Sequence, residues 1–350
     1  MNTVEAKECL DKCLAEIKLN NPTLRDSTLK NYTNMIFRIL KGSLSAGLNC
    51  SSQNNIPFAF KYNSHQVINV INKQLWLEEP KEITERTRKN YFAVMLSLLR
   101  GCARDEPDSD YLKNYNYHFE TLNNNIKALE MNQSPKPKEL QLKDLSIKKL
   151  LKGLNYHKSK TDIDSSLLAL VGAINCYLCL RNEPANMLIS NEYLSQDEPD
   201  FKRTNFIWNK GRNKKYMYIR YNKVRTEKDD QREIPITGEL NTLLNKYIKQ
   251  YDDLMGGIGN IRPLLYKSKG YKDAEFYSEL DTMSSANYVG LVKRVWKHMD
   301  LDLTSTLIRK VYAMDIRTQY NGKLSEEMKA CVKLDHSKQI HDTNYIVFFD

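Results

Sequence analysis

A run of fourteen residues in the middle of the chain most constrains its fold. LLALVGAINCYLCL, residues 167–180, is apolar almost throughout, and residues 165–180 together predict a helix that is buried on every side. The run is shorter than the roughly 18 residues that cross a bilayer, so it predicts the centre of a globular core and no membrane span. Because the helix must end before Pro184, it places Arg181 at the end of a core helix.

The 350 residues divide by pattern into two predicted domains and a linker. Residues 1–130 combine helical apolar spacing with polar, Asn-rich connectors, and they predict helices over 26–42, 84–101 and 111–129. Residues 131–142, MNQSPKPKELQL, carry two prolines and no apolar periodicity, which predicts a linker. The second domain, 143–350, then opens with a predicted helix, LSIKKLLKGL.

Positive charge is concentrated in one segment of the second domain. Lys and Arg number 53 against 43 Asp and Glu, a net charge of +10 that favours a polyanionic partner. Residues 201–232 contain eleven basic and three acidic side chains, a net charge of +8. The same segment holds three runs with the composition of strands, at 204–208, 215–221 and 232–237. It therefore predicts a small antiparallel sheet lined with Lys and Arg.

The cysteines indicate a reducing compartment. All seven are scattered, and no signal peptide opens the chain, so we expect no disulfide framework and an intracellular location. Cys176 and Cys179 form one C-x-x-C inside the apolar run, without the second ligand pair of a zinc site. We interpret them as core thiols and expect no metal.

Four features follow one another in the second domain. They are Arg181 in CLRNEPANMLI, lysines on the basic hairpin, Arg309 in STLIRKVYA, and the pair His336 and Tyr345 in LDHSKQIHDTNY. Their order and spacing resemble those of the tyrosine recombinases, the phage-type integrase family. Each residue alone also has an ordinary structural interpretation, since an arginine that follows a helix commonly caps its last carbonyls.

The resemblance implies an architecture and an activity. It implies a mainly α fold with a small antiparallel β-sheet, an α+β class. A helical core-binding domain at 1–130 and a catalytic domain at 143–350 would form a C-shaped clamp on double-stranded DNA. It also implies a homo-oligomer on DNA, dimer or tetramer, and no membrane partner. The activity is site-specific breaking and rejoining of DNA through a 3′-phosphotyrosine link, without metal, ATP or another cofactor.

The resemblance assigns a role to each residue of the set. Tyr345 would attack the phosphodiester as the nucleophile, and His336 would donate a hydrogen bond to the phosphate. Arg181 and Arg309 would fork onto the nonbridging oxygens and stabilise the negative charge that builds up there.

At three positions this chain differs from the family pattern or leaves the matching residue undecided. The general acid is a lysine before a strand similar to REIPI, and Lys223 is slightly favoured over Lys228. The family acid usually falls where this chain has Pro184, with Glu183 one residue earlier. Thr306 replaces the usual histidine; its hydroxyl can donate a hydrogen bond but cannot shuttle a proton near neutral pH. We therefore expect a slower enzyme.

Basic residues outside this set are predicted to contact DNA phosphates. Those in the first domain lie near the starts of two predicted helices, where the helix dipole disfavours cations. Those in the second domain lie on the hairpin. A solvated basic face is the alternative for each of them. They are Arg25, Lys30, Arg86, Arg88, Lys89, Arg212, Lys214 and Lys215.

Two alternative functions stay open. A type IB topoisomerase resembles the same catalytic set and relaxes DNA by the same chemistry. A non-catalytic, architectural DNA-binding descendant of a recombinase would explain Thr306 and Pro184. The compartment would be the host nucleus or cytoplasm for a viral or eukaryotic mobile element, and the cytoplasm for a bacterial one.

Overall fold

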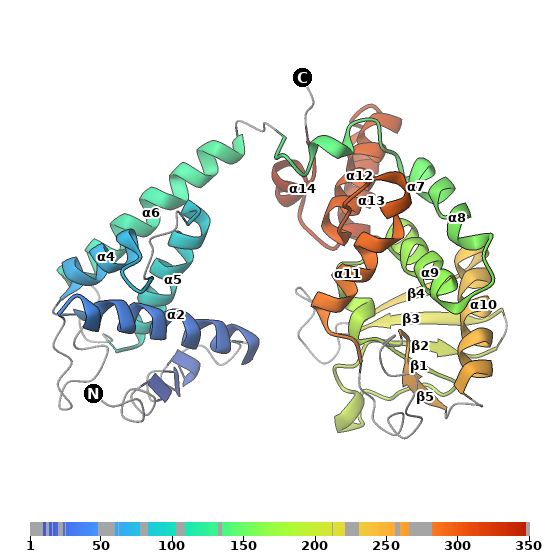
Figure 1. The fold of residues 1–350 in the computed structure, drawn as a ribbon, viewed down its shortest axis with the longest axis horizontal. Coiled ribbons are helices and arrows are strands. Elements are labelled where there is room, and N and C mark those ends of the chain that lie inside the picture. Colours follow the sequence, from blue (N-terminus) through green and yellow to red (C-terminus); the bar gives the residue numbers. More distant parts are fainter. Residues whose placement is uncertain are drawn as a thin grey trace. The chain divides into compact units, whose positions relative to one another are not determined.

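The structure is a computed structural model of the chain. It describes residues 10–11, 14–15, 17–19, 24, 26–47, 60–61, 63–77, 83–102, 109–131, 135–211, 213–220, 231–255, 260–265 and 282–347. The chain divides into two compact units, Met1–Asn132 and Gln133–Asp350, and each is described by itself (Figure 1).

The described part of the first unit is helical. α5 packs along α6, and α2 contacts both α4 and α5. The three helices that the sequence predicts are confirmed as α2, α5 and α6, while α4, in the polar segment SHQVINVINK, is additional. The helices are α2 (Asp26–Ser45), α4 (Ser64–Lys73), α5 (Glu85–Cys102) and α6 (Asp110–Met131).

The first unit has a core made from one face of each helix. Ile36 and Ile39 of α2 and Tyr91 and Met95 of α5 are all buried, at the three- and four-residue spacing of an amphipathic helix. The Trp76 ring, after α4, packs 4.9 Å from the Tyr91 ring. The helical apolar spacing of these segments therefore corresponds to the buried faces of α2 and α5.

α9 (Ile163–Leu178) is the central helix of the second unit. The Asp162 carboxylate caps it by accepting a hydrogen bond from the Ser165 amide at 2.8 Å. Every residue from Ser165 to Cys176 is buried, which confirms the predicted helix with no solvent-facing side. At Gly172 an added Cβ would lie 2.8 Å from the Val295 side chain, so glycine permits the close packing here.

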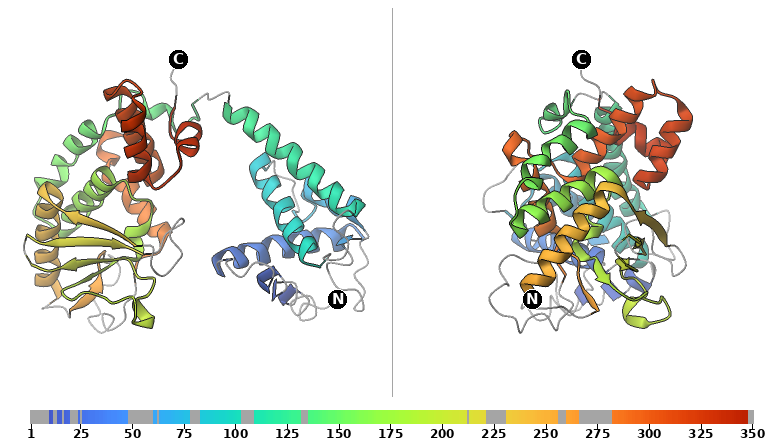
Figure 2. Two further views of the ribbon diagram at one scale, coloured as in Figure 1. Left: turned by 180° about the vertical axis from the view of Figure 1, so that it is seen from behind. Right: turned by 90° about the vertical axis from the view of Figure 1, so that its right-hand side faces the viewer.

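The other helices of the second unit surround α9 or extend from its end. α7, α8, α10, α11 and α12 all contact α9. α12, α13 and α14 lie together at the end of the unit opposite β5 (Figure 2). These helices are α7 (Ile147–Gly153), α8 (Asn155–Lys158), α10 (Gly238–Met255), α11 (Ser285–Val295), α12 (Ser305–Gln319), α13 (Leu324–Leu334) and α14 (Lys338–Asn344).

The sheet is mixed, not purely antiparallel as the sequence predicts. Its described strands follow the order β4-β3-β2-β1-β5, and β1 pairs with β2 in parallel while the other pairs are antiparallel. The three predicted runs correspond to β2, β3 and β4. The two additional strands have three residues each, too few to show an alternating pattern. The strands are β1 (Leu188–Ser190), β2 (Phe206–Asn209), β3 (Lys215–Ile219), β4 (Arg232–Ile236) and β5 (Ile261–Pro263).

Part of the predicted linker packs on the second unit. Residues Leu140–Leu142 form a 3₁₀ helix, and Leu142 is buried in the core around α9. The Glu139 carboxylate pairs with Lys310 of α12 at 2.6 Å. Apolar spacing could not reveal this, because one buried leucine, one ion pair and two hydrogen bonds between Gln141 and the backbone of Asp302 hold the segment.

The described residues confirm the mainly helical α+β class, with its small sheet in the second unit. Among the helices that the structure describes, none combines the length and the apolar character needed to cross a membrane.

Candidate active site

A cavity of about 840 Å³ lies where the end of α9 meets the turn from α13 to α14. It brings together three residues predicted from the sequence, Arg181, His336 and Tyr345, and Arg309 contacts Tyr345 directly. We call it the tyrosine pocket. Its lining residues are Arg181, Arg232, Cys331, Val332, Asp335, His336, Ser337, Ile340, Asn344 and Tyr345.

Tyr345, which lines the pocket, is in direct contact with Arg309. The Arg309 Nε donates a hydrogen bond to the Tyr345 hydroxyl at 3.1 Å, and the guanidinium carbon lies 5.2 Å from the centre of the tyrosine ring. Arg309 is 2% exposed and Tyr345 7% exposed, so water screens this contact poorly. Burial lowers the pKa of Arg309, and the interaction with Tyr345 opposes that shift. The arrangement holds a positive charge against the phenol oxygen.

Three arginines converge on the C-terminal end of α13. The backbone carbonyls of residues 333, 334 and 335 accept hydrogen bonds from Arg232 at 3.2 Å, from Arg309, and from Arg181 at 3.5 Å, respectively. The helix ends there because Asp335 adopts a left-handed conformation with φ of 57°. The last carbonyls of a helix lack intrahelical partners and carry partial negative charge. The arginines therefore gather at a natural cation site.

Arg181 is held through its backbone while its side chain stays available. Its amide donates to the buried Glu183 carboxylate at 2.6 Å. Its Nη1 is buried and has no hydrogen-bond partner among the described residues. Cys179, in a left-handed conformation with φ of 51°, caps α9 and turns its carbonyl to Arg309 Nη1 at 2.8 Å. Glu183, not the position of Pro184, thus supplies the acid beside the arginines.

His336 packs against the nucleophile candidate and a second histidine. Its ring lies 4.4 Å from the Tyr345 ring, and its Nε2 is 3.2 Å from His341 Nδ1. Burial, followed by the charge of Arg309, lowers the pKa of His336 to about 3. In this structure His336 is therefore neutral at neutral pH.

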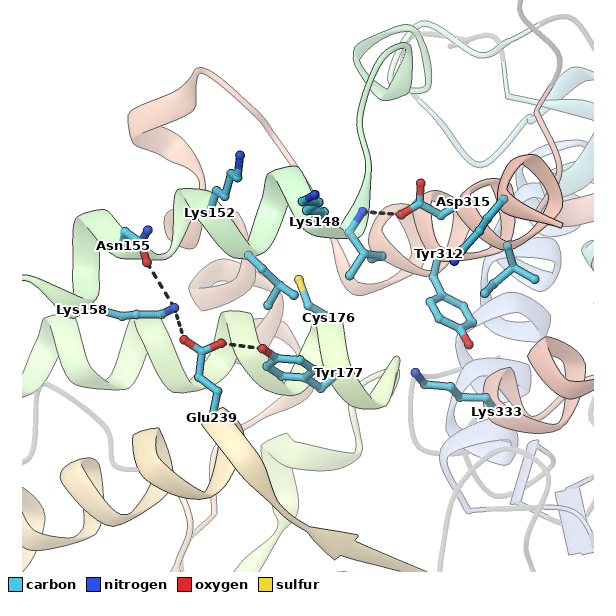
Figure 3. A pocket seen from close by; sticks show the side chains of 14 residues that line it. Lys148, Lys152, Asn155, Lys158, Cys176, Tyr177, Glu239, Tyr312, Asp315 and Lys333 are labelled. Atoms are coloured by element: carbon cyan, nitrogen blue, oxygen red, sulfur yellow. Dashed lines mark hydrogen bonds and ion pairs between the residues drawn. The ribbon is translucent and has the colours of Figure 1, made fainter. Parts of the chain in front are cut away.

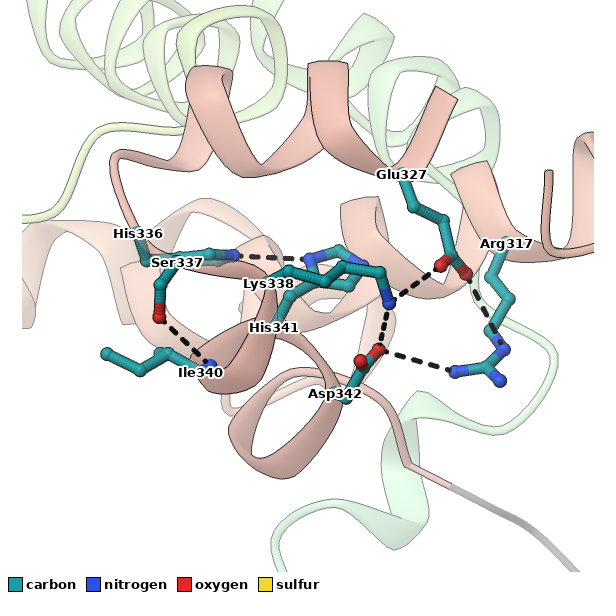
Figure 4. A network of polar contacts seen from close by, with 8 residues as sticks. All are labelled: Arg317, Glu327, His336, Ser337, Lys338, Ile340, His341 and Asp342. Atoms are coloured by element: carbon teal, nitrogen blue, oxygen red, sulfur yellow. Dashed lines mark hydrogen bonds and ion pairs between the residues drawn. The ribbon is translucent and has the colours of Figure 1, made fainter. Parts of the chain in front are cut away.

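An ion-pair network fixes α14, the helix that ends at Tyr345 (Figure 4). Lys338 lies 2.9 Å from Glu327 of α13 and also pairs with Asp342. Arg317 of α12 approaches Glu327 at 3.7 Å. Since Glu327 is nearly fully buried, this pairing is screened less than a surface pair. The network positions the tyrosine by tying three helices together.

Among the described residues, one predicted catalytic residue lies outside the pocket. Thr306 is exposed in the first turn of α12 and is not among the residues that line the cavity. Lys223 and Lys228 lie outside the described residues, so the structure does not choose between them.

The predicted DNA contacts have three different outcomes. Lys30, Arg86 and Lys214 are exposed, whereas Arg25 and Arg212 lie outside the described residues. These exposed cations keep the predicted role open.

The remaining cations are at least partly buried. Arg88 is half-buried, and Lys89 donates to Asn123 at 2.7 Å. Lys215 is not the exposed cation that the predicted phosphate contact requires, because its side chain is 2% exposed and its ammonium donates to the Gly211 carbonyl at 3.0 Å. Burial lowers the pKa of Lys215. The chain returns through the hairpin turn and places a carbonyl over this lysine.

A second cavity, of about 600 Å³, lies between α7, α9 and α12 (Figure 3). Glu239 pairs there with Lys158 and accepts a hydrogen bond from the Tyr177 hydroxyl at 2.5 Å. The pKa of Glu239 is lowered by these hydrogen bonds, while burial raises the pKa of Tyr177 to about 12. Burial also raises the pKa of the Cys176 thiol in the same wall. The described cavity therefore holds no activated nucleophile.

The sequence did not single out two residues of the tyrosine pocket, Arg232 and Cys331, or His341 beside it. Arg232 opens the strand REIPI, whereas the family pattern points to a lysine before that strand. His341 and Cys331 flank His336 at a spacing of five residues on each side, a pattern that could have singled them out.

The chain matches no protein-family model, no curated protein and no solved structure. A function is therefore assigned from the geometry of the pocket.

Proposed function

We propose that the protein is a site-specific DNA recombinase or integrase that breaks and rejoins DNA through a 3′-phosphotyrosine intermediate at Tyr345. The observation that carries the proposal is the position of Tyr345, which lines a cavity with Arg181 and His336 and whose hydroxyl accepts a hydrogen bond from Arg309 Nε at 3.1 Å. A guanidinium beside the phenol oxygen would stabilise the negative charge that builds up on a phosphate attacked there.

The reaction would exchange one phosphoester bond for another. The Tyr345 oxygen attacks phosphorus, the bond to the 5′ oxygen breaks, and the net proton movement is from the phenol to that leaving oxygen. The general acid would be Lys223 or Lys228. A 5′-hydroxyl from another strand would reverse the step and release the tyrosine. The chemistry needs neither a metal nor ATP.

The arginines would stabilise the charge on the phosphate. Arg181 has a partnerless Nη1, and its Nη2 makes a long bond of 3.5 Å to a carbonyl. Phosphate oxygens accept charge-assisted hydrogen bonds that are roughly twice as strong as those to neutral acceptors. A scissile phosphate would therefore displace the α13 carbonyl from Arg181. Arg232, which also lines the pocket and donates to the carbonyl of residue 333, could make the same exchange.

The departures from the family pattern fit a slower enzyme. Glu183 takes the place of the family acid by holding the Arg181 backbone at 2.6 Å. The Thr306 hydroxyl cannot shuttle a proton near neutral pH, and Thr306 is exposed, so it does not replace the missing histidine. The rate, and not the type of reaction, would be affected.

DNA would be held by both units. Lys30 and Arg86 of the first unit and Lys214 of the second are exposed cations that could neutralise phosphates. In this proposal the units close as a C-shaped clamp, and copies of the chain assemble on two DNA sites to exchange strands. The compartment would be that of the DNA substrate.

One observation favours a second candidate function, architectural DNA binding without cleavage. The arginines of the pocket already satisfy the end of α13, which is a structural role by itself. In that case Tyr345 would be a packing residue beside Leu334 and Ile346.

A covalent-trapping assay distinguishes these functions. Nicked duplexes from the flanks of the encoding element are incubated with wild-type protein, Tyr345→Phe or Tyr320→Phe, without added metal, and separated on denaturing gels. Tyr320 is 39% exposed at the end of α12 and serves as the matched control. We expect a DNA-linked band with wild type and Tyr320→Phe that is absent with Tyr345→Phe.

Other results would change the assignment. Equal DNA retention by all three proteins without a covalent band would favour the architectural function. A covalent band with relaxation of supercoiled DNA, but no joining of strands from two duplexes, would favour a type IB topoisomerase.

A further inference from the structure

A cluster of one cysteine and two histidines lies beside the tyrosine pocket. Cys331 is in the last turn of α13, His336 follows the end of that helix, and His341 is in α14. One ligand atom from each, the thiol sulfur and a ring nitrogen, lies within 4.8 Å of the others. Cys331 is 3% exposed and His341 is fully buried. Such a set can bind a metal ion, because thiolate and imidazole are the ligands that Zn²⁺ prefers.

The two histidines already have the separation of ligands on one ion. His336 Nε2 and His341 Nδ1 are 3.2 Å apart, and Figure 4 shows these two nitrogens pointing toward one another. Two nitrogens at the usual Zn–N distance on a tetrahedral ion are about 3.3 Å apart. A sulfur and a nitrogen on such an ion are about 3.6 Å apart, so Cys331 Sγ, which lies within 4.8 Å of the ring nitrogens, could join them by moving inward. A metal would take the place of the proton that the nitrogens now share.

The far side of each ring carries a buried nitrogen. His336 Nδ1 and His341 Nε2 have no hydrogen-bond partner among the described residues. With a metal between the rings, both inner nitrogens present lone pairs and both outer nitrogens carry the hydrogens. The Cys331 thiol would release one proton to solvent for each ion bound.

We propose that Cys331, His336 and His341 form a binding site for Zn²⁺ or a similar divalent transition metal that ties α14 to the end of α13. The fourth position would face the cavity, which Cys331 and His336 line, and a water molecule would fill it. Because α14 ends at Tyr345, the ion would hold the tyrosine-bearing helix in place. The site shares His336 with the proposed catalytic set, but metal binding is measured without DNA, so its test is independent of strand cleavage.

Cobalt binding in the absence of DNA tests the site directly. Full-length protein stripped of metal is titrated with Co²⁺ without oxygen, and the thiolate-to-cobalt charge-transfer band is recorded. Wild type is compared with Cys331→Ala, with His341→Gln, and with Cys176→Ala, a matched buried thiol outside the cluster. We expect Cys331→Ala to bind one ion fewer per chain with loss of that ion's thiolate band. We expect His341→Gln to bind at least tenfold more weakly and Cys176→Ala to match wild type.

Thermal melting gives a second readout that also checks folding. Saturating Zn²⁺ should raise the Tm of wild type and of Cys176→Ala but not that of Cys331→Ala, because ligands that bind only the folded state stabilise it. Equal cobalt binding and equal Tm shifts in wild type and Cys331→Ala would overturn the proposal. So would the absence of any binding at micromolar metal. A protein that binds cobalt as expected but forms no covalent DNA band would retain this site and lose the proposed function.

Discussion

Two regions of the second unit bury an arginine in different ways. Arg220, at the end of β3, is 2% exposed, and its nitrogens donate to the carbonyls of residues 194 and 201, to Gln231 and to the Tyr193 hydroxyl. Its guanidinium also stacks 4.7 Å from the Phe206 ring. In the tyrosine pocket, by contrast, Arg181 leaves Nη1 without a partner in the described residues.

The contrast shows that burial of a cation does not by itself indicate a site. Arg220 lies within the basic segment 201–232, which the sequence associates with DNA, yet all its nitrogens are used by the fold. Arg181 opens onto a cavity with donor capacity left over. A cation–π contact and filled donors stabilise structure, whereas an unfilled donor beside a nucleophile can bind substrate.

Arg181→Ala should have the largest effect, and it should act on the reaction. We expect covalent-complex formation to slow by about 10²–10³-fold, the loss that follows removal of one donor to a developing oxyanion. Stability should fall by about 1 kcal/mol or less, because the side chain makes one long hydrogen bond to the protein. Single-turnover cleavage and chemical denaturation measure the two quantities. Arg181→Lys, which keeps the charge, is the control. A loss below tenfold in Arg181→Ala would show that Arg181 is not a catalytic residue.

Arg220→Met should reverse this pattern. The substitution removes four side-chain hydrogen bonds and takes the Arg220 donor from the buried Leu194 carbonyl, so we expect the free energy of unfolding to fall by about 3 kcal/mol. Cleavage measured well below the Tm should stay within twofold of wild type. Urea denaturation and the trapping assay test both parts, with Lys249→Met, on an exposed cation of α10, as the control. If Arg220→Met instead lost cleavage at unchanged stability, the two arginine regions would not differ as described.

The fold could be predicted where one segment determines its own structure. The apolar run gave α9, and helical spacing gave α2, α5 and α6, because amphipathic periodicity is a local property. β1 and β5 could not be predicted, since each has three residues and depends on pairing with distant segments of the chain. The parallel β1–β2 pair likewise depends on contacts between distant segments, so the mixed sheet was not visible in the sequence.

Some residues of the candidate site could be predicted from the sequence, but the contacts between them could not. Order and spacing picked out Tyr345, His336 and the two arginines. Nothing in the sequence indicates that the end of α13 attracts three guanidiniums, because that depends on where the helix packs. The burial of Lys215 could not be predicted for the same reason, since it depends on how the hairpin folds and brings the Gly211 carbonyl to its ammonium.

Arg232→Ala sharpens the comparison with an intermediate case. Arg232 donates to the carbonyl of residue 333 and also lines the tyrosine pocket, so it combines a structural and a binding position. We expect cleavage to slow by about tenfold and the free energy of unfolding to fall by about 1 kcal/mol. Single-turnover cleavage and urea denaturation test this. A change confined to stability would group Arg232 with Arg220 and leave Arg181 as the phosphate-binding arginine on that side.

The smallest effect concerns a cation paired with an acid. Lys310, next to Arg309 in α12, lies 2.6 Å from the Glu139 carboxylate, which also accepts from the Lys136 amide at 2.9 Å. Burial opposes ionisation of Glu139, but the hydrogen bonds and charge of Lys310 prevail and lower its pKa. Folding therefore favours the charged form, and its stabilisation is complete above the unfolded pKa of about 4.3 and lost as pH falls through the folded value.

Glu139→Gln keeps the shape and removes the charge. The variant should be less stable than wild type by about 1 kcal/mol at pH 7. The difference should shrink as the pH is lowered below about 4.3, because wild type then loses the same charge. Urea denaturation across this range measures it, and cleavage at pH 7 should not change. A stability difference that stays constant with pH would mean that packing, and not charge, joins this segment to α12. Lys310 would then resemble Arg220, as a cation whose surroundings serve the fold alone.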